Sequence, residues 1–133
     1  MGKQTSAQKK RTAVAAYLVL VRDALETAHA AASAAFLEFA KTAERTPEGR
    51  IVDVFGGAWV IVYKPSYRFR SALKTLGEIE RGDGGAWIFS NFGRHVVKEQ
   101  SVMAHRIACE AACAILRRSF PDDGEFFTHS FRD

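Results

Sequence analysis

Two cysteines are few for a chain of 133 residues, and their placement excludes a disulfide framework. Cys109 and Cys113 lie four residues apart in a helical pattern, where their Cβ vectors diverge too far for a bridge. A chain without disulfides fits a reducing compartment, so we expect it in the cytoplasm. His105 lies on the same stripe, and all three residues are zinc-ligand types, but zinc sites usually draw ligands from two chain segments. We expect no metal and interpret the thiols as small groups packed against a neighbouring helix.

Long hydrophobic runs and catalytic signatures are also missing. The apolar run at 13–21 ends at Arg22 and Asp23, and it is too short to span a membrane. Neither Ser66 nor Ser90 has the GxSxG context of a nucleophile, and no CxxC pair or clustered-acid motif occurs. We therefore expect no membrane attachment, no cofactor and no catalytic residue, and an enzyme ranks behind two binding functions.

Glycine and proline are absent from Ala7 to Glu44, which favours one long helix. Apolar residues recur there at alternating spacings of four and three, so they share one helical stripe. Small side chains in its middle would let another helix approach closely. Pro47 cannot continue the helix, so we expect its end at 46–49. The stripe consists of Val14, Leu18, Val21, Leu25, Ala28, Ala32, Ala35 and Phe39.

The tetrapeptide Gly-Gly-Ala-Trp occurs twice, at 56–59 and 84–87, and each copy opens an apolar run followed by a basic stretch. The first copy joins two β-rich runs, Arg50–Phe55 and Ala58–Lys64. Two glycines between such runs predict a β-hairpin, because a type I′ turn needs positive φ at both positions. A third strand is expected at Ala86–Phe92.

Two further helices are predicted. Ser66 can cap a short helix with Phe69, Leu73 and Leu76 on its apolar face. A second long helix is expected from Val96 to Ser119. Its apolar face consists of Met103, Ile107, Ala111 and Ile115, widened by Ala104, Ala108 and Ala112.

Together these elements predict a single α+β domain over residues 1–133, in the order α-β-β-α-β-α. It would have a long N-terminal helix, a β-hairpin, a crossover helix, a third strand and a long C-terminal helix packed on a small sheet. The strand–helix–strand unit at 58–92 would form a crossover between parallel strands. Residues 1–8 would form a basic arm. Residues 120–133 are acidic and rich in phenylalanine, and we expect them to dock on the body or on a partner.

The segment 63–74 carries four positive charges and no acid, with aromatic rings between them. The formal charge of +4 and the pI of about 9.3 also favour anionic partners. If the two Gly-Gly-Ala-Trp copies are structurally equivalent, the basic stretches after them lie at the same end of the sheet. Basic side chains bind phosphates, and exposed rings stack on bases. The predicted contact residues are Lys64, Tyr67, Arg68, Arg70, Lys74, Arg94 and Lys98.

The leading hypothesis is therefore a small intracellular nucleic-acid-binding or nucleic-acid-associated accessory protein. The simplest alternative for the charges is a solvated surface with Phe69 in the core. The alternative function is a protein-protein interaction module, acting as a homodimer, an inhibitor or an adaptor. Its contact surfaces would be the alanine-rich helix and the phenylalanine-rich tail. Salt dependence separates the two functions, since only phosphate binding weakens steeply with salt.

Overall fold

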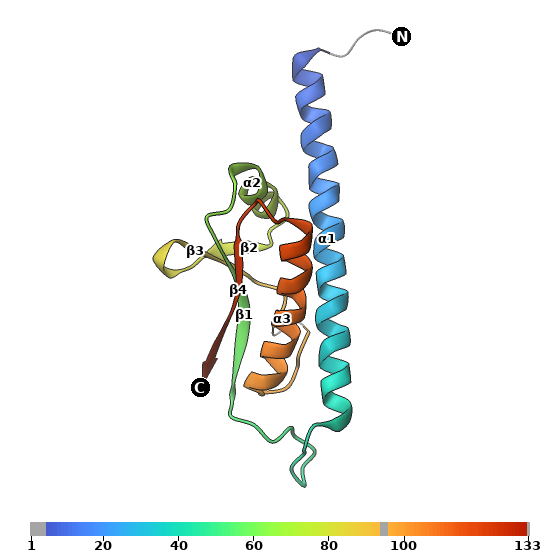
Figure 1. The fold of residues 1–133 in the computed structure, drawn as a ribbon, viewed down its shortest axis with the longest axis vertical. Helices are drawn as coiled ribbons and strands as arrows, with labels where there is room; N and C mark the ends of the chain where they lie inside the picture. The colour runs from blue at the N-terminus through green and yellow to red at the C-terminus, as the bar shows by residue number, and fades with distance from the viewer. Residues whose placement is uncertain (1–4, 94–95, 133) are drawn as a thin grey trace.

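The computed structural model describes residues 5–93 and 96–132, and it confirms the α+β class with a long N-terminal helix (Figure 1). Helices and strands alternate irregularly along the chain, and a short 3-10 turn, η1, precedes the third strand. The elements are α1 (Ser6–Thr42), β1 (Gly56–Tyr63), α2 (Tyr67–Thr75), β2 (Ile79–Arg81), η1 (Asp83–Gly85), β3 (Ala86–Phe89), α3 (Val102–Ser119) and β4 (Glu125–Arg132).

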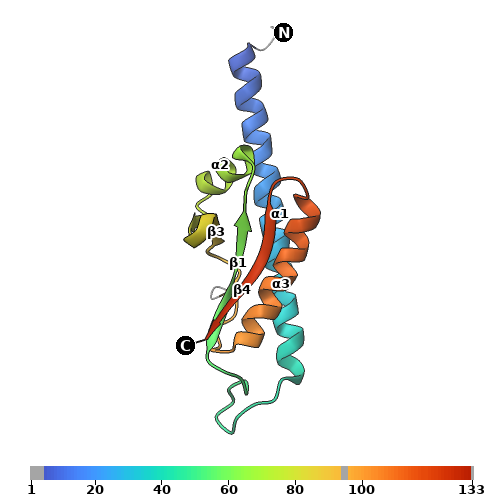
Figure 2. The ribbon, with the colours of Figure 1, turned by 60° about the vertical axis from the view of Figure 1, so that its left-hand side comes forward.

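The elements form three layers, with α3 between the sheet and α1 (Figure 1, Figure 2). The sheet has the strand order β2-β3-β1-β4, and every neighbouring pair is antiparallel. The smaller helix α2 packs beside α1 and near the β2 edge. None of the helices in the described ranges combines the length and the apolar character needed to cross a bilayer.

Helix α1 begins with a capping box and carries the predicted stripe. The Thr5 side chain accepts the backbone N–H of Gln8 at 3.1 Å, and the Gln8 side chain accepts the N–H of Thr5 at 2.7 Å. Residues 6–8 therefore belong to the helix and not to a separate arm. Ala28 and Ala32 are completely buried, which confirms a close-packed middle. Val14 is 61% exposed because the N-terminal end of α1 projects beyond the body (Figure 1).

Helix α3 begins at Val102, six residues later than predicted, because two side chains fix its start. Ser101 accepts the N–H of Ala104 at 3.1 Å. The Asp53 carboxylate accepts the Ser101 hydroxyl at 2.8 Å and the Met103 N–H at 2.7 Å. A residue from the α1–β1 connection thus satisfies a free donor at the helix N-terminus.

The predicted apolar face of α3 is confirmed at Ala104, Ala108 and Ala112, which are buried, but it is wrong at Met103, which is 45% exposed. The helix lies between two layers, so it must bury two of its sides. Small residues fill both contacts and let the sheet and α1 approach closely. The buried residues are Ala104, His105, Ala108, Cys109, Ala112, Cys113 and Leu116.

The predicted hairpin at the first Gly-Gly pair is also wrong. Gly56 and Gly57 are the first residues of β1, and they pair with Arg132 and Phe131 of β4. A Cβ on Gly56 would lie 2.1 Å from the Phe131 carbonyl oxygen, so close approach of two strands requires the glycine. Residues 50–55 form no strand, and only a single bridge links Ile51 to Arg45. The strand partner of β1 is instead the C-terminal segment.

The predicted parallel crossover is wrong as well, because β3 runs antiparallel to β1. Ile61 faces Ile88 and Tyr63 faces Ala86, and the short strand β2 lies between α2 and β3 in the chain. The second Gly-Gly-Ala-Trp copy begins in the 3-10 turn, where Gly84 has a φ of 64°. The two copies are therefore not equivalent, and the segments that follow β1 and β3 leave the sheet at opposite ends.

The two faces of the sheet differ in what covers them. Val60, Val62 and Phe126 point to the helices and are at least 98% buried. On the outer face, the Trp59 ring lies 5.5 Å from His129 and 4.7 Å from Phe131, measured between ring centroids. In the described part of the chain no helix packs on this outer face (Figure 1, Figure 2).

A candidate nucleic-acid interface between α1 and α2

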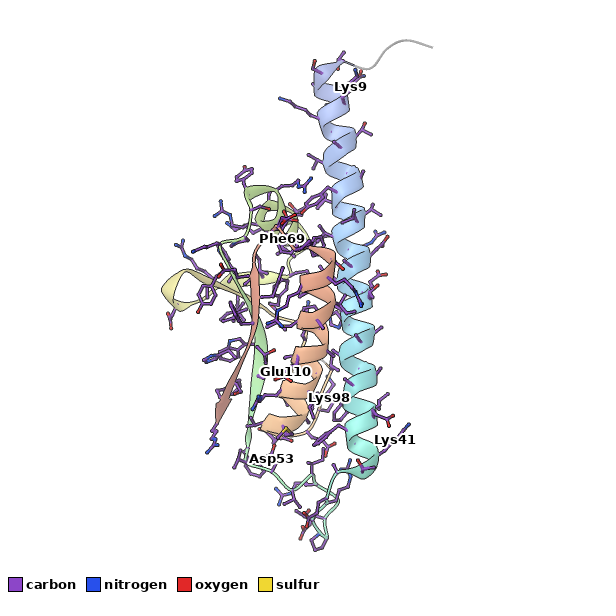
Figure 3. The ribbon with its side chains drawn as sticks, viewed as in Figure 1. Lys9, Lys41, Asp53, Phe69, Lys98 and Glu110 are labelled. Atoms are coloured by element: carbon purple, nitrogen blue, oxygen red, sulfur yellow. The ribbon has the colours of Figure 1, made fainter. Side chains whose placement is uncertain are left out.

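A groove of about 270 Å³ runs between the projecting part of α1 and the exposed side of α2. Its walls are mostly apolar, and tyrosine and arginine side chains border them. We call it the basic groove. Figure 3 shows Lys9 near the free end of α1 and Phe69 at α2. The groove is lined by Ala13, Val14, Tyr17 and Leu18 of α1 and by Tyr67, Arg68, Ser71, Ala72 and Thr75 of α2.

The N-terminus of α2 is fixed by Ser66 and Asp123. The Ser66 hydroxyl accepts the N–H of Phe69 at 3.3 Å and donates to the Asp123 carboxylate at 2.7 Å. The Ser66 N–H also donates to the Asp123 carbonyl at 2.8 Å. This confirms the predicted cap and ties α2 to the turn before β4. Lys64, just after β1, has a φ of 51°, a conformation that non-glycine residues seldom adopt.

The 100° spacing of helical residues separates the side chains of α2 into three groups. Phe69 and Leu73 are completely buried against the body. Arg68 lies on the groove side, whereas Arg70 and Lys74 follow the opposite flank. Tyr67 lies between these cations and is 77% exposed. A ring this exposed can stack on a partner.

Arg68 forms the boundary between the groove and the body. Its guanidinium carbon lies 4.2 Å from the centroid of the Tyr17 ring, and a terminal nitrogen lies 3.9 Å from the Asp123 carboxylate. The Tyr17 hydroxyl is buried and has no hydrogen-bond partner among the described residues. Burial raises the pKa of Tyr17, and the negative charge of Asp123 raises it further.

The positive surface continues past Lys74 to β2. The Lys74 Nζ lies 4.7 Å from the centroid of the Trp87 ring, and the Arg81 guanidinium carbon lies 5.7 Å from it. These contacts place two cations beside one half-buried indole. The sequence analysis missed Arg81, Trp87 and Tyr17, because only the antiparallel return of β2 and β3 brings the first two beside α2.

The N-terminal part of α1 adds positive charge above the groove. Lys10 lies one turn before Val14 and about two turns before Tyr17, so the three share one helical face. Lys9 and Lys10 are exposed, and no acid lies in the first turn of α1 or of α2. Cations at helix N-termini oppose the helix dipole, so folding does not explain their placement.

Two predicted contact residues do not join this group. Lys98 lines a different cavity with Gly56, at the start of β1, whereas α2 follows the end of β1. The eight residues of β1 put roughly 20 Å or more between the two places. The basic stretches therefore do not lie at one end of the sheet. Arg94 lies outside the described residues.

The candidate metal-ligand residues and the two thiols lie apart from the groove. In residues 5–93 and 96–132 no three histidine, cysteine or acidic side chains converge on one point. Burial raises the pKa of Cys109 to about 12 and also raises the pKa of Cys113. Both thiols therefore stay protonated and unreactive at neutral pH.

Comparison with known proteins adds no function by analogy. The chain matches no protein-family model, no curated protein and no solved structure. The case for a function therefore rests on the groove and its side chains.

Proposed function

We propose that the protein binds single-stranded nucleic acid in the basic groove. The observation that carries this proposal is the Tyr67 ring, 77% exposed and flanked by Arg68 and Arg70 on a helix without acids. An unpaired base can stack on a ring of this kind. Phosphates on either side of that base would then meet cations.

The charges around Tyr67 suit a single strand of nucleic acid that crosses α2. Arg68 lines the groove, Lys10 lies one helical turn before Val14 of its wall, and Arg70 and Lys74 lie on the flank of α2 beyond Tyr67. Lys64 lies between β1 and α2 in the chain. Within the described ranges, the one acid paired with these cations is Asp123, which lies 3.9 Å from Arg68 and also accepts the Ser66 hydroxyl. Neutralising about four phosphates would give a strong dependence on salt.

The dimensions of the groove favour an unpaired base over a duplex. Its apolar walls include Val14 and Leu18. A volume of about 270 Å³ admits one planar ring, whereas the bases of a duplex are stacked on each other and not available to Tyr67.

The test is fluorescence anisotropy with labelled oligonucleotides, single-stranded and duplex, of DNA and of RNA. Tyr67→Ala should weaken single-strand binding by about tenfold and leave duplex binding nearly unchanged, since stacking contributes about 1–3 kcal/mol per base. Tyr63→Ala, which removes a tyrosine from the outer sheet face, is the matched control. Absence of binding to all four nucleic acids at low salt would overturn the proposal.

A protein-binding function is favoured by a different observation, the uncovered outer face of the sheet. Phe127 is 44% exposed there, beside Tyr63 at a ring distance of 5.9 Å. The alanines assigned to such an interface by sequence are buried, Ala28 and Ala32 completely. The surface for this alternative is therefore β1 and β4 and not α1. Sedimentation of the wild type and Phe127→Ser at several concentrations tests it, because only self-association makes the sedimentation coefficient rise with concentration.

A further inference from the structure

Three side chains of different chemistry line the basic groove from α2. Tyr67 lies one helical turn before Ser71, and Arg68 lies three residues before it, so both are neighbours of Ser71 on the helix surface. Together they offer the groove an aromatic ring, a guanidinium group and a hydroxyl. A ligand that stacks on Tyr67 therefore lies close to the polar groups of Arg68 and Ser71.

The Arg68 side chain is held in place without using its hydrogen-bond donors. Its guanidinium carbon lies over the Tyr17 ring, 4.2 Å from the centroid. The Asp123 oxygen, at 3.9 Å, is beyond hydrogen-bond distance, and the Tyr17 hydroxyl has no hydrogen-bond partner among the described residues. Arg68 thus donates to neither neighbour, and its side chain is 67% exposed. The planar fork of N–H groups is available to a ligand.

The rest of the groove lining favours a base over a phosphate as the acceptor for Arg68. Val14, Leu18 and Ala72 belong to this lining, and their side chains have no polar group. A phosphate in the groove would lose hydration that these side chains cannot replace, whereas a base has an apolar ring for the wall and a polar edge for Arg68. Four cations outside the lining remain for the phosphates, namely Lys10, Lys64, Arg70 and Lys74.

Guanine is the base whose edge fits two parallel N–H donors. Its N7 and O6 atoms are adjacent acceptors, and arginine binds them in a bidentate manner. Adenine has an amino donor in place of O6, which would face the donors of Arg68. The pyrimidines have no N7 and present at most one acceptor on the corresponding edge. The Ser71 hydroxyl can donate or accept, so it does not discriminate among the bases.

We infer that Arg68 makes the basic groove selective for guanine in single-stranded nucleic acid, an inference that rests on the proposed function and names the base that the site takes. The guanine ring stacks on Tyr67, and its N7 and O6 atoms accept hydrogen bonds from the Arg68 guanidinium. Tyr17 acts as a positioning residue, because its ring holds the plane of that guanidinium.

The test compares single bases within one short strand by fluorescence anisotropy with the wild-type protein. The strands are oligothymidine, or oligouridine if RNA binds more tightly, with one central guanine, adenine, cytosine, hypoxanthine or 7-deazaguanine. Guanine should bind about tenfold more tightly than adenine or cytosine, which is within the range for one bidentate pair. Hypoxanthine keeps N7 and O6 and should bind like guanine. 7-Deazaguanine lacks N7 and should lose most of the preference.

Two lysine variants connect the preference to Arg68. Arg68→Lys keeps the positive charge but loses the planar fork, so the preference for guanine should disappear. Arg70→Lys makes the same change on the opposite flank of α2 and should keep the preference, whatever its effect on the overall affinity. Circular dichroism checks the folding of both variants, and the base analogues test the same contact in the unaltered protein.

The outcomes separate the site from its selectivity. Failure of every strand to bind would overturn the proposed function and the guanine selectivity with it. Binding without a preference for guanine, or equal binding of guanine and 7-deazaguanine, would overturn the selectivity alone. A preference that persists in Arg68→Lys would also overturn it, because another residue would then contact the base edge.

Discussion

Asp53 accepts a hydrogen bond from the backbone N–H of Met103 at 2.7 Å, although 50 positions separate the two residues in the chain. The same carboxylate oxygen accepts the Ser101 hydroxyl at 2.8 Å. The start of α3 is therefore held by the connection that leads into β1. This contact couples the middle layer of the fold to the beginning of the sheet.

Replacing Asp53 with alanine should lower the free energy of unfolding by about 1–2 kcal/mol, the usual cost of losing an N-terminal cap. Urea denaturation followed by circular dichroism measures the loss. Asp122→Ala, at an exposed site one residue from Asp123, is the control and should be neutral. Equal stability of both variants would contradict the capping role.

The stability that Asp53 supplies should depend on pH in the acid range. Burial alone would raise the pKa of this carboxyl, but hydrogen bonds from Met103, Ser101 and Val54 outweigh it and hold the pKa below its ordinary value. A lowered folded-state pKa stabilises the protein above the unfolded-state pKa of about 3.9 and ceases to do so as pH falls through the folded value. Unfolding between pH 2 and 6 should therefore show a step in the wild type that Asp53→Ala lacks.

Ala32 lies fully buried in the contact between α1 and α3. Ala32→Leu should overpack this contact and cost about 1–3 kcal/mol of stability. Ala30→Leu makes the same change on the exposed side of α1 and should cost almost nothing. Thermal denaturation distinguishes them, and equal melting temperatures would mean that the two helices do not pack as closely as described.

The neighbours Phe126 and Phe127 of β4 point to opposite faces of the sheet. Phe126 is 2% exposed and contacts Phe69 at a ring distance of 5.8 Å, whereas Phe127 is 44% exposed. Phe126→Ala should cost about 3–5 kcal/mol, and Phe127→Ala less than about 1 kcal/mol. The reverse order in chemical denaturation would show that the register of β4 is shifted by one residue.

Gly56 should not tolerate alanine, because a Cβ there would collide with the backbone of β4 and with Val102. We expect Gly56→Ala to cost about 3 kcal/mol or more. Gly49 also has a positive φ but has open space around it, so Gly49→Ala should cost only about 1–2 kcal/mol. Measured unfolding free energies of the two variants separate the collision from the strain.

Salt should weaken single-strand binding in proportion to the phosphates contacted. With about four contacts, log affinity should fall with log salt at a slope of roughly −3. The double variant Arg70→Ala and Lys74→Ala should flatten the slope by about 1.4 and weaken all sequences alike. Arg22→Ala, on the projecting helix but outside the groove, is the control for loss of surface charge. A slope unchanged by the double variant would mean that the nucleic acid contacts a different surface of the protein.

Local sequence determined α1, α2 and the exposed cationic side of α2, but not the start of α3. The absence of glycine and proline predicts the length of α1. The Ser66 cap and the spacing of Phe69 and Leu73 predict the position of α2, because capping and helical periodicity act within a few residues. Tyr67, Arg68, Arg70 and Lys74 could be placed on one short helix for the same reason.

Only the tertiary structure decided the strand partners and the groove. Gly56 and Gly57 have the composition of a turn, but they are strand residues because β1 pairs with the C-terminal segment. About seventy residues separate the paired segments in the chain, and no local sequence pattern encodes a contact over that separation. Tyr17 meets Arg68 because α2 packs beside α1, and Lys98 lies apart from Lys74 because antiparallel pairing reverses the direction of β3. Sequence fixes which side chains are cationic or aromatic, whereas strand direction and helix packing fix which of them share a surface.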